Sequence, residues 1–577
     1  MHSSPSADIG ADAGSPTLRG IPVSPGAVAG PVARLAAPPR LPDAEPQVTD
    51  VDAEQRAARE ALAAVADELE ARATGASNAS KTAADVLSAQ AMMVRDPELA
   101  NRVDQAIRGG KSAPFAVDAA FRTFRDLLAS LGGYLGERAA DLDDLRDRVV
   151  ARLLGLPMPG LPDPGHPYVL VADDLAPADT ASLDPEKVVA IVTERGGPTS
   201  HTAILARSLG VPAIVACTHV LELEDGVNVL VDGSSGVVRI DPAADEVTEA
   251  TEAARRAREE AALVTGPGRT ADGHAVKLLV NIGALGDLDA AAAADSEGVG
   301  LFRTEFLFLD KETEPSVAEQ RDAYARVFTA FAGRRVVVRT LDAGADKPLA
   351  FAAMNEEPNP ALGVRGLRTS RHLPDLLEHQ LVALAEAAKD SDAGLVWVMA
   401  PMVSTPAEAA EFTRVAREHG LSVAGSMIEV PAAALRSKPL IEHCDFLSLG
   451  TNDLAQYTFA ADRMLGELAD LLDPWQPALL ELVGRTAQAG VESGKSVGVC
   501  GEAAADPLLA PVLVGLGINS LSMAPVALNP VRATLAKLTL AQCRTLADRA
   551  LAAPDAAAAR ELVAAAVREW TAAPSTT

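Results

Sequence analysis

Apolar residues at helical spacing dominate the chain after Gln47, behind a short segment with a β-like pattern. The β-like run at 20–35 is interrupted by proline and glycine, and a proline-rich connector at 37–46 separates it from the helical part. Between Gln47 and Asp96 there is no proline, and Ala, Glu, Arg and Leu prevail. This composition and spacing predict an all-helical unit over 47–150.

Short apolar runs replace the helical pattern after a second Pro/Gly-rich connector at 151–165. They predict a small α/β domain that contains one short helix at 202–209 and is completed by the run at 20–35, so that the helical unit is an insertion. A charged stretch at 245–263 predicts a linker helix with a solvated surface. The strand-like runs cover 168–172, 188–192, 213–217, 227–233 and 236–240.

Eight further apolar runs, separated mostly by helical segments, occupy the C-terminal half. Apolar runs without polar alternation are typical of parallel strands that are buried on both faces. Eight such units in this length favour a (β/α)₈ barrel, with a doubly wound sheet as the alternative that periodicity alone leaves open. The runs are 276–283, 299–304, 335–340, 395–402, 421–430, 446–450, 496–501 and 518–523.

Taken together, the patterns predict a multidomain α/β protein. The predicted segments are a disordered leader, 1–17; an α/β domain in two parts, 18–46 and 151–244; the helical domain, 47–150; a linker helix, 245–268; and the barrel, 269–577.

Composition narrows the classes of function. Asp plus Glu number 79 against 51 Lys plus Arg, and the resulting charge of −28 disfavours nucleic acid and anionic membranes as partners. The 4 cysteines are too scattered for a disulfide framework or a CxxC zinc site. No signal peptide and no run of about 18 apolar residues is present, so we expect a cytoplasmic protein.

Chemically versatile residues gather where the predicted barrel strands end. In a (β/α)₈ barrel these ends share one face, which carries the function. A single arginine or glutamate there is most simply solvated or paired with a neighbour, but the full set favours a site. Its members are Arg303, Arg339, Glu429, Asn452, Asp453, Arg463, Cys500 and Glu502.

The chemistry of this set is coherent. Glu429 and Asp453 are hard carboxylates that suit Mg²⁺ with free positions for substrate oxygens. The arginines suit phosphate and carboxylate groups. An unperturbed thiol at Cys500 would be protonated at neutral pH and could give a proton, although a packed core cysteine is the simpler alternative. The set favours a small substrate that bears phosphate and carboxylate and passes through an enolate.

A histidine motif occurs in the predicted α/β domain. A Gly-Gly-Pro turn at 196–198 is followed by the capping residues Thr199 and Ser200, and His201 begins the short helix. A helix N-terminus disfavours a protonated imidazole and stabilises a bound phosphoryl group. A lone loop histidine is usually incidental, but no other histidine of the chain has such a setting.

Several of these segments resemble the PEP-utilising enzymes, and most of all the phosphoenolpyruvate (PEP)–protein phosphotransferases, the Enzyme I family of the bacterial sugar phosphotransferase system. The resemblance covers about residues 20–530 and includes the helical part at 89–99 and 137–149. The motifs are GGPTSHTAILARSLGVPAI, GLFRTEFLFLD, VVVRTLDAGADKP, GSMIEVP, LSLGTNDLAQYTFAADR and GVCGE.

The resemblance implies a role for each matching residue. His201 would be phosphorylated, Glu429 and Asp453 would hold Mg²⁺, and Cys500 would protonate enolpyruvate. PEP would be bound by Arg303, Arg339, Asn452, Asp453 and Arg463, with Arg365 and Lys347 as further contacts. The family also implies transfer from a swivelling histidine domain to the phosphocarrier protein HPr, docked on helices within 47–150, and a homodimer formed through the barrel.

Relatives with other activities fit less well. Pyruvate phosphate dikinase and PEP synthase need an ATP-binding domain, the nitrogen-related paralogue carries a sensory domain, and a fusion with HPr needs a second histidine motif. Two loops depart from the family pattern: Met464 and Leu465 replace Gly-Asn, and Ala345 replaces glycine. A non-catalytic scaffold is the remaining alternative, and it is disfavoured because every assigned chemical group is present. We expect an active phosphotransferase.

Overall fold

The computed structural model describes residues 15–571 except 36–38, 43, 77–87, 89, 132–138, 157–159, 176–182, 198–199, 310, 345–348, 353–356, 390–394 and 464–465. The chain divides into two compact units. One comprises Met1–Ala29, Thr193–Thr218 and Val229–Thr577, and the other Gly30–Val192 and His219–Asn228. Among the described residues, no helix has the length and apolar character needed to cross a membrane.

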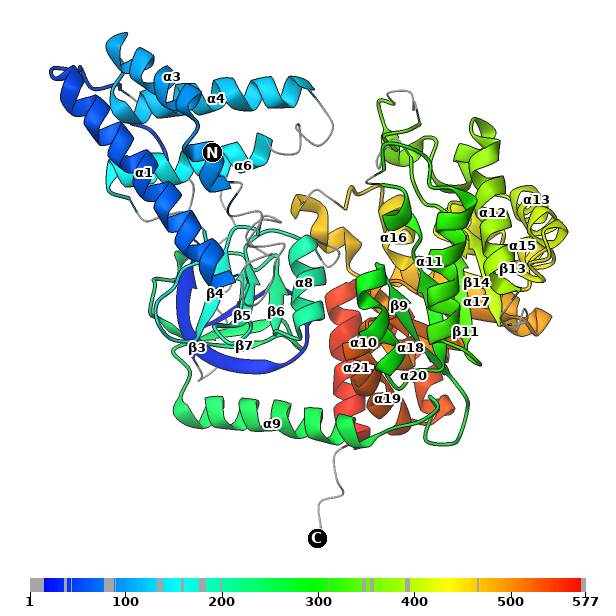
Figure 1. Ribbon diagram of the computed structural model, residues 1–577. Coiled ribbons are helices and arrows are strands. Elements are labelled where there is room, and N and C mark those ends of the chain that lie inside the picture. Colours follow the sequence, from blue (N-terminus) through cyan, green and yellow to red (C-terminus); the bar gives the residue numbers. More distant parts are fainter. Residues whose placement is uncertain are drawn as a thin grey trace, which may run out of the picture. The chain divides into compact units, whose positions relative to one another are not determined.

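The C-terminal part is a closed barrel of eight strands, and all neighbouring strands are parallel (Figure 1). Each of the eight predicted apolar runs overlaps one strand, so the barrel is confirmed and the doubly wound alternative is wrong. The strands are β9 (Lys277–Ile282), β10 (Gly298–Phe302), β11 (Arg335–Arg339), β12 (Val396–Ala400), β13 (Val423–Ile428), β14 (Phe446–Leu449), β15 (Ser496–Val499) and β16 (Ser520–Met523).

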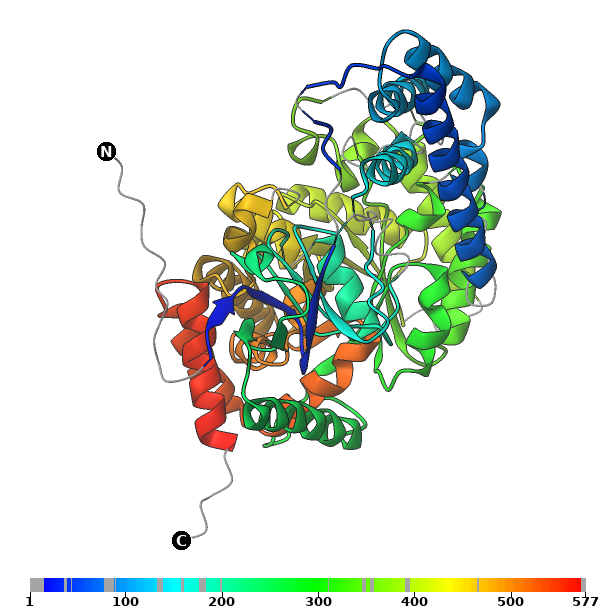
Figure 2. The same ribbon diagram turned by 90° about the vertical axis from the view of Figure 1, so that its left-hand side faces the viewer.

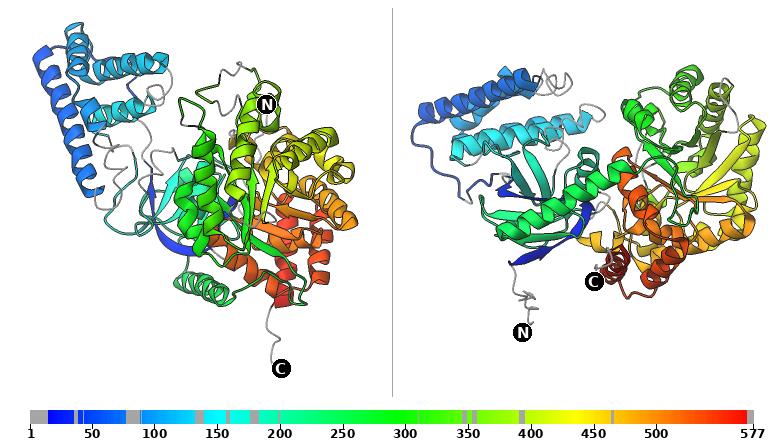
Figure 3. Two further views of the ribbon diagram at one scale, coloured as in Figure 1. Left: turned by 45° about the vertical axis from the view of Figure 1, so that its right-hand side comes forward. Right: turned by 90° about the horizontal axis from the view of Figure 1, so that it is seen from below.

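Helices surround these strands, as Figure 3 shows. Side chains on the outer face of the strands, such as Val338 and Val398, are buried in one core with helix residues such as Leu384 and Phe412. The helices are α10 (Leu288–Ala293), α11 (Val317–Ala330), α12 (Pro374–Ala388), α13 (Pro406–Glu418), α14 (Pro431–Leu435), α15 (Ser437–Ile441), α16 (Thr451–Phe459), α17 (Pro477–Ser493), α18 (Leu509–Gly515), α19 (Leu528–Ala536), α20 (Leu540–Leu551) and α21 (Ala556–Thr571).

The strand residues that alternate with this outer set point into the barrel. Val337, Met399, Met427 and Phe446 form a separate apolar cluster there, and Cys500 belongs to the same cluster. The interior is therefore a packed core, and the two ends of the barrel are distinct places.

The predicted helical unit contains α1 (Val51–Ala76), α3 (Pro97–Arg108), α4 (Ala113–Leu131) and α6 (Ala139–Leu154), which lie together as one group in Figures 1 and 2. The carboxylate of Asp96 caps α3 by accepting the Glu98 N–H, and Pro97 fits the first turn because it has no N–H to satisfy. Leu62, Val103 and other apolar side chains on the facing sides of these helices form their own buried core.

The predicted α/β domain contains mixed strand pairing. β1, β7 and β8 pair antiparallel, β2 pairs antiparallel with β6, and β3 pairs parallel with β4. The short helix α8 (His201–Leu209) and the linker helix α9 (Ala244–Leu263) are as predicted. The strands are β1 (Thr17–Arg19), β2 (Ile21–Ser24), β3 (Ala27–Arg34), β4 (Tyr168–Ala172), β5 (Val188–Thr193), β6 (Ala213–Val215), β7 (Asn228–Asp232) and β8 (Val237–Ile240).

Candidate active site

The predicted site residues do meet at one end of the barrel. Arg339 is the last residue of β11, Arg303 follows β10, and Glu429 follows β13. Asp453 lies in the first turn of α16, directly after β14, and Cys500 follows β15. Because all eight strands are parallel, these positions share the C-terminal mouth, where active sites of this fold lie.

Arginines and carboxylates alternate across the mouth in a continuous chain of ion pairs. Arg339 contacts Glu305 at 3.0 Å and Asp342 at 3.1 Å. Arg365 is paired with the same Asp342 and also with Asp453, at 3.0 and 3.2 Å. Each carboxylate therefore faces at least one guanidinium, which fixes the loops that follow β11 and β14 against each other.

Arg365 uses its side-chain nitrogens within this network of ion pairs. Its Nε donates to one Asp342 oxygen, and its two terminal nitrogens reach the carboxylates of Asp342 and Asp453. The side chain is only 1% exposed. The geometry favours Arg365 as a residue that positions Asp453, whereas the sequence suggested a direct contact with substrate.

Arg339 has one hydrogen-bond donor that is not used. Burial disfavours its charge, but the carboxylates of Glu305, Asp342 and Glu429 together raise its pKa, so the guanidinium is charged. Its Nε is buried and has no hydrogen-bond partner among the described residues. An unsatisfied charged donor at the mouth is suited to an anionic substrate oxygen.

Glu429 is a buried carboxylate whose charged form is disfavoured. Burial raises its pKa to about 8, helped by the nearby charges of Asp342 and Asp453 and opposed by Arg339 and Arg365. One of its oxygens accepts the Met402 N–H at 2.5 Å. Glu429 therefore holds its proton more tightly than an exposed glutamate does.

Cys500 follows β15 at the same mouth and is 3% exposed. Its thiol donates to the Leu449 carbonyl oxygen at 3.5 Å, and the Ser448 hydroxyl is close enough to influence the thiol. Burial raises the pKa of Cys500, and Glu429 adds to this effect, while the charges of Arg339 and Arg303 oppose it. The result is a neutral thiol at the mouth, available as a proton donor.

The remaining predicted residues complete the rim. Arg303 is exposed and close enough for its charge to influence Cys500. Arg463 reaches Asp453 at 3.5 Å with its side chain 24% exposed, so it keeps capacity for a ligand. Asn452 accepts the Glu502 N–H at 3.3 Å through its side-chain oxygen. Lys347, Ala345, Met464 and Leu465 lie outside the described residues.

Two carboxylates of the ion-pair chain, Glu305 and Asp342, were not singled out in the sequence. Glu305 accepts hydrogen bonds from Arg339 and from the Asp342 N–H, both at 3.0 Å. Each follows a strand-end arginine by two or three positions, and that spacing is the signal that could have revealed them. Among the described residues, no group of three or more His, Cys, Asp and Glu side chains is arranged as a metal site.

The histidine motif has the predicted local structure. His201 is the first residue of α8, and the side chain of the N-cap residue Ser200 accepts the Ala203 N–H at 3.2 Å. Gly196 has φ of 98°, a left-handed value that glycine adopts without strain. Pro198 and Thr199 and the side chain of His201 lie outside the described part.

Replacing Arg365 by leucine should lower the free energy of unfolding by about 3–5 kcal/mol, because Asp342 and Asp453 would remain buried without this partner. Arg371→Leu is the matched control, since its side chain is 64% exposed and pairs with Glu408; it should cost less than about 1 kcal/mol. Urea titrations followed by circular dichroism measure both. Equal losses for the two variants would contradict the structural role of Arg365.

Comparison with protein-family models shows three matches in chain order. Residues 19–138 match the model described as PEP-utilising enzyme, N-terminal. Residues 164–236 match PEP-utilising enzyme, mobile domain, and residues 257–540 match PEP-utilising enzyme, PEP-binding domain. His201 falls in the second match, and the whole barrel mouth falls in the third.

Curated relatives match over almost their full length. The chain is 55% identical to the phosphoenolpyruvate-protein phosphotransferase of Streptomyces coelicolor, over 94% of this chain and 98% of that one. It is 43% identical to the protein of the same name from Haloferax volcanii, over 87% and 91%, respectively. For that of Bacillus subtilis the identity is 37%, over 92% and 96%.

Proposed function

The chain belongs to the PEP-utilising enzymes, among the phosphoenolpyruvate-protein phosphotransferases, and on this premise we propose that it moves the phosphoryl group of PEP onto its own His201. From there the group passes to a histidine of the phosphocarrier protein HPr. Pyruvate is released. This reaction is the first step of sugar uptake by the phosphotransferase system.

The observation that carries the proposal is the arrangement at the barrel mouth. Spare guanidinium donors, a group of carboxylates and a neutral thiol lie at the same end of the barrel. PEP presents a phosphate, a carboxylate and a carbon that must be protonated. The guanidinium groups suit the phosphate and the carboxylate, the acidic residues suit Mg²⁺, and the thiol can protonate the carbon.

Arg303, Arg339 and Arg463 would bind the phosphate and carboxylate oxygens, with Asn452 beside them. Arg339 and Arg463 are held in place by Glu305, Asp342 and Asp453, so little ordering is left for the moment of binding. Their charges also stabilise the negative charge that develops on the transferring phosphoryl group and on the enolate. Lys347 is proposed as a further contact on sequence grounds.

Glu429 and Asp453 would hold Mg²⁺. Their carboxylates are hard oxygen donors, and a divalent cation beside them would lower the pKa of Glu429, which burial and the neighbouring Asp342 and Asp453 raise. Two protein ligands would leave positions for substrate oxygens and water. A bound Mg²⁺ supplies charge for phosphate and enolate oxygens.

Cys500 would complete the reaction on the pyruvate side. Its S–H bond breaks as a C–H bond forms at C3 of enolpyruvate, which converts the enolate into pyruvate. Burial keeps the thiol neutral until then, because it raises the pKa. The proton would thus come from a group close enough to Arg339 and Arg303 for their charges to act on it.

The partners follow from the family. HPr would dock on the helices within 47–150, and the barrel would mediate a homodimer. A histidine domain that visits both PEP and HPr must swivel about the linker that contains α9.

Incubation with PEP and Mg²⁺ tests the proposed function. We expect one pyruvate and one acid-labile phosphoryl group per chain, with the phosphoryl group lost again when HPr is added. Chelation of Mg²⁺ by EDTA should prevent both products, and restored Mg²⁺ should recover them. Pyruvate is measured with lactate dehydrogenase and the phosphoryl group by intact mass. Bound PEP without any mass gain would favour a non-catalytic scaffold.

A further inference from the structure

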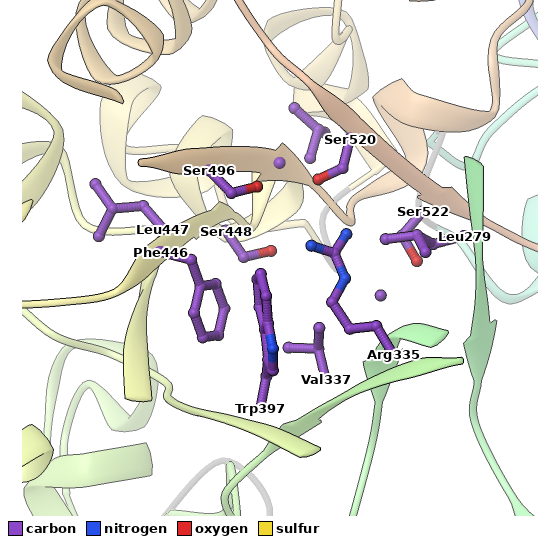
Figure 4. Close-up of a pocket in the computed structure, with 13 residues that line it drawn as sticks. Leu279, Arg335, Val337, Trp397, Phe446, Leu447, Ser448, Ser496, Ser520 and Ser522 are labelled. Atoms are coloured by element: carbon purple, nitrogen blue, oxygen red, sulfur yellow. The ribbon is translucent and has the colours of Figure 1, made fainter. Parts of the chain in front are cut away.

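A small cavity, lined by apolar side chains together with four serines and an arginine, lies inside the barrel at the end opposite the active site. Its volume is about 20 Å³, room for one water molecule. Arg335, Ser496 and Ser520 line it, and they are the first residues of β11, β15 and β16. In Figure 4 the guanidinium of Arg335 and the hydroxyls of Ser448 and Ser520 point into the same space.

The cavity is an exception to the usual packing of this fold, because bulky branched side chains normally fill a (β/α)₈ barrel. Here serines line one side, and glycines make room for them. A Cβ atom at Gly498 would lie 2.3 Å from the Ser520 hydroxyl oxygen, and one at Gly300 would lie 2.4 Å from that of Ser522. A polar space of this size that is lined by hydroxyls is suited to a water molecule.

One hydroxyl lies between the cavity and the thiol of the active site. Ser448 lines the cavity, and its hydroxyl is close enough to the Cys500 thiol to lower the pKa that burial raises. On β9, Asn281 donates to the Cys500 carbonyl oxygen at 3.2 Å and accepts from the Ser522 hydroxyl at 2.5 Å. Within the barrel, Cys500 also belongs to the apolar cluster that contains Leu301 and Met399.

The outer end of the cavity reaches the surface. Arg335, Trp397 and Ser496 are only partly buried, whereas Ser448 is 6% exposed. Arg335 stacks on Trp397, with its guanidinium carbon 4.3 Å from the ring centre, and no carboxylate of the described residues is within ion-pair distance of it. Burial lowers the pKa of Arg335 to about 10, against the effect of Glu297, so it remains positive at neutral pH.

We propose that this cavity holds the water that returns a proton to Cys500 after each turnover, through the Ser448 hydroxyl. The inference rests on the proposed function, since it requires Cys500 to protonate enolpyruvate. Once the thiol has given its proton to C3, a thiolate remains. Ser448 donates its hydroxyl proton to the sulfur, and its oxygen takes a proton from the cavity water, which takes one from bulk solvent.

Protons and electrons balance in these steps, and no other reactant is needed. One proton leaves the solvent, one C–H bond forms in pyruvate, and no group is oxidised or reduced. The charge of Arg335 stabilises the negative charge while it passes through the cavity. A route through the far end keeps the substrate side of Cys500 closed to water while PEP and pyruvate occupy the mouth.

Rapid-quench kinetics with excess PEP, Mg²⁺ and HPr tests the route. Ser448→Ala should form the first pyruvate at the parent's rate, because its Cys500 is already protonated. Later turnovers should be slower by about 10-fold or more. A burst of one pyruvate per chain results, with the Michaelis constant for PEP unchanged. Ser520→Val, which retains the Ser448–Cys500 contact but fills the cavity, should show the same burst.

Ser426→Ala is the matched control. Ser426 is equally buried, but it lies on the outer face of β13, where its hydroxyl contacts the Cys444 sulfur at 3.3 Å. This variant should turn over like the parent. Linear time courses at the parent's rate for both cavity variants would overturn the route, and so would a first turnover as slow as the later ones. A parent that forms no pyruvate would instead overturn the proposed function itself.

Discussion

Replacing His201 by alanine should abolish phosphorylation of the chain by PEP. The proposed reaction has no other acceptor, because no other histidine is predicted to stand at the N-terminus of a glycine-preceded helix. The free N–H groups and the dipole of α8 would stabilise a phosphoryl group on His201, and alanine offers no atom to carry it. Intact mass after incubation with PEP and Mg²⁺ should therefore show one added phosphoryl group in the parent and none in the variant.

His219→Ala is the matched control, since the His219 side chain is 54% exposed and is paired with Glu222. It should be phosphorylated like the parent. The His201→Ala variant should still bind PEP, because every predicted PEP ligand lies in the barrel. A phosphoryl group that persists in His201→Ala would contradict the assignment and direct the search to another side chain.

The barrel could be predicted because its strands are buried on both faces. Such strands give apolar runs, and Val336 to Val338 is an example: one side faces the helices and the other faces the interior. The active-site mouth followed, since residues at the ends of parallel strands must share one face. This rule alone places four residues at the mouth: Arg303, Arg339, Glu429 and Cys500.

The ion-pair partners of the site residues were harder to predict than the positions of these residues. Nothing in the sequence shows that Asp342 accepts from both Arg339 and Arg365, because that contact joins two loops whose paths depend on the whole mouth. For the same reason, the sequence does not show that Arg365 pairs with two aspartates. Its nitrogens are occupied by two buried carboxylates, and one-dimensional spacing cannot distinguish a ligand for substrate from a partner for an aspartate.

The far end of the barrel was missed for a different reason. Arg335 lies four residues before Arg339 in the same strand, so alternation alone places both inside. The cavity, however, depends on a glycine in one strand facing a serine in the next, as Gly498 faces Ser520. Register between strands fixes that match, and a single sequence does not reveal register.

Cys500→Ala should separate the two halves of the reaction. Without the thiol, enolpyruvate has no proton donor at C3, and we expect pyruvate formation from PEP to fall by about 100- to 10,000-fold. Transfer between phosphorylated HPr and His201 involves no carbon–hydrogen bond. The variant should therefore accept a phosphoryl group from phosphorylated HPr at the parent's rate.

Cys444→Ala provides the control, because Cys444 is equally buried and also contacts a serine hydroxyl, but on the outer face of the barrel. It should retain both activities. Rates of pyruvate formation are measured with lactate dehydrogenase, and transfer from phosphorylated HPr by intact mass. Equal PEP-dependent rates for Cys500→Ala and the parent would exclude the thiol as the donor. Loss of both activities would instead mean that Cys500 is needed for the fold. A purely chemical role predicts a defect only in the step that forms pyruvate.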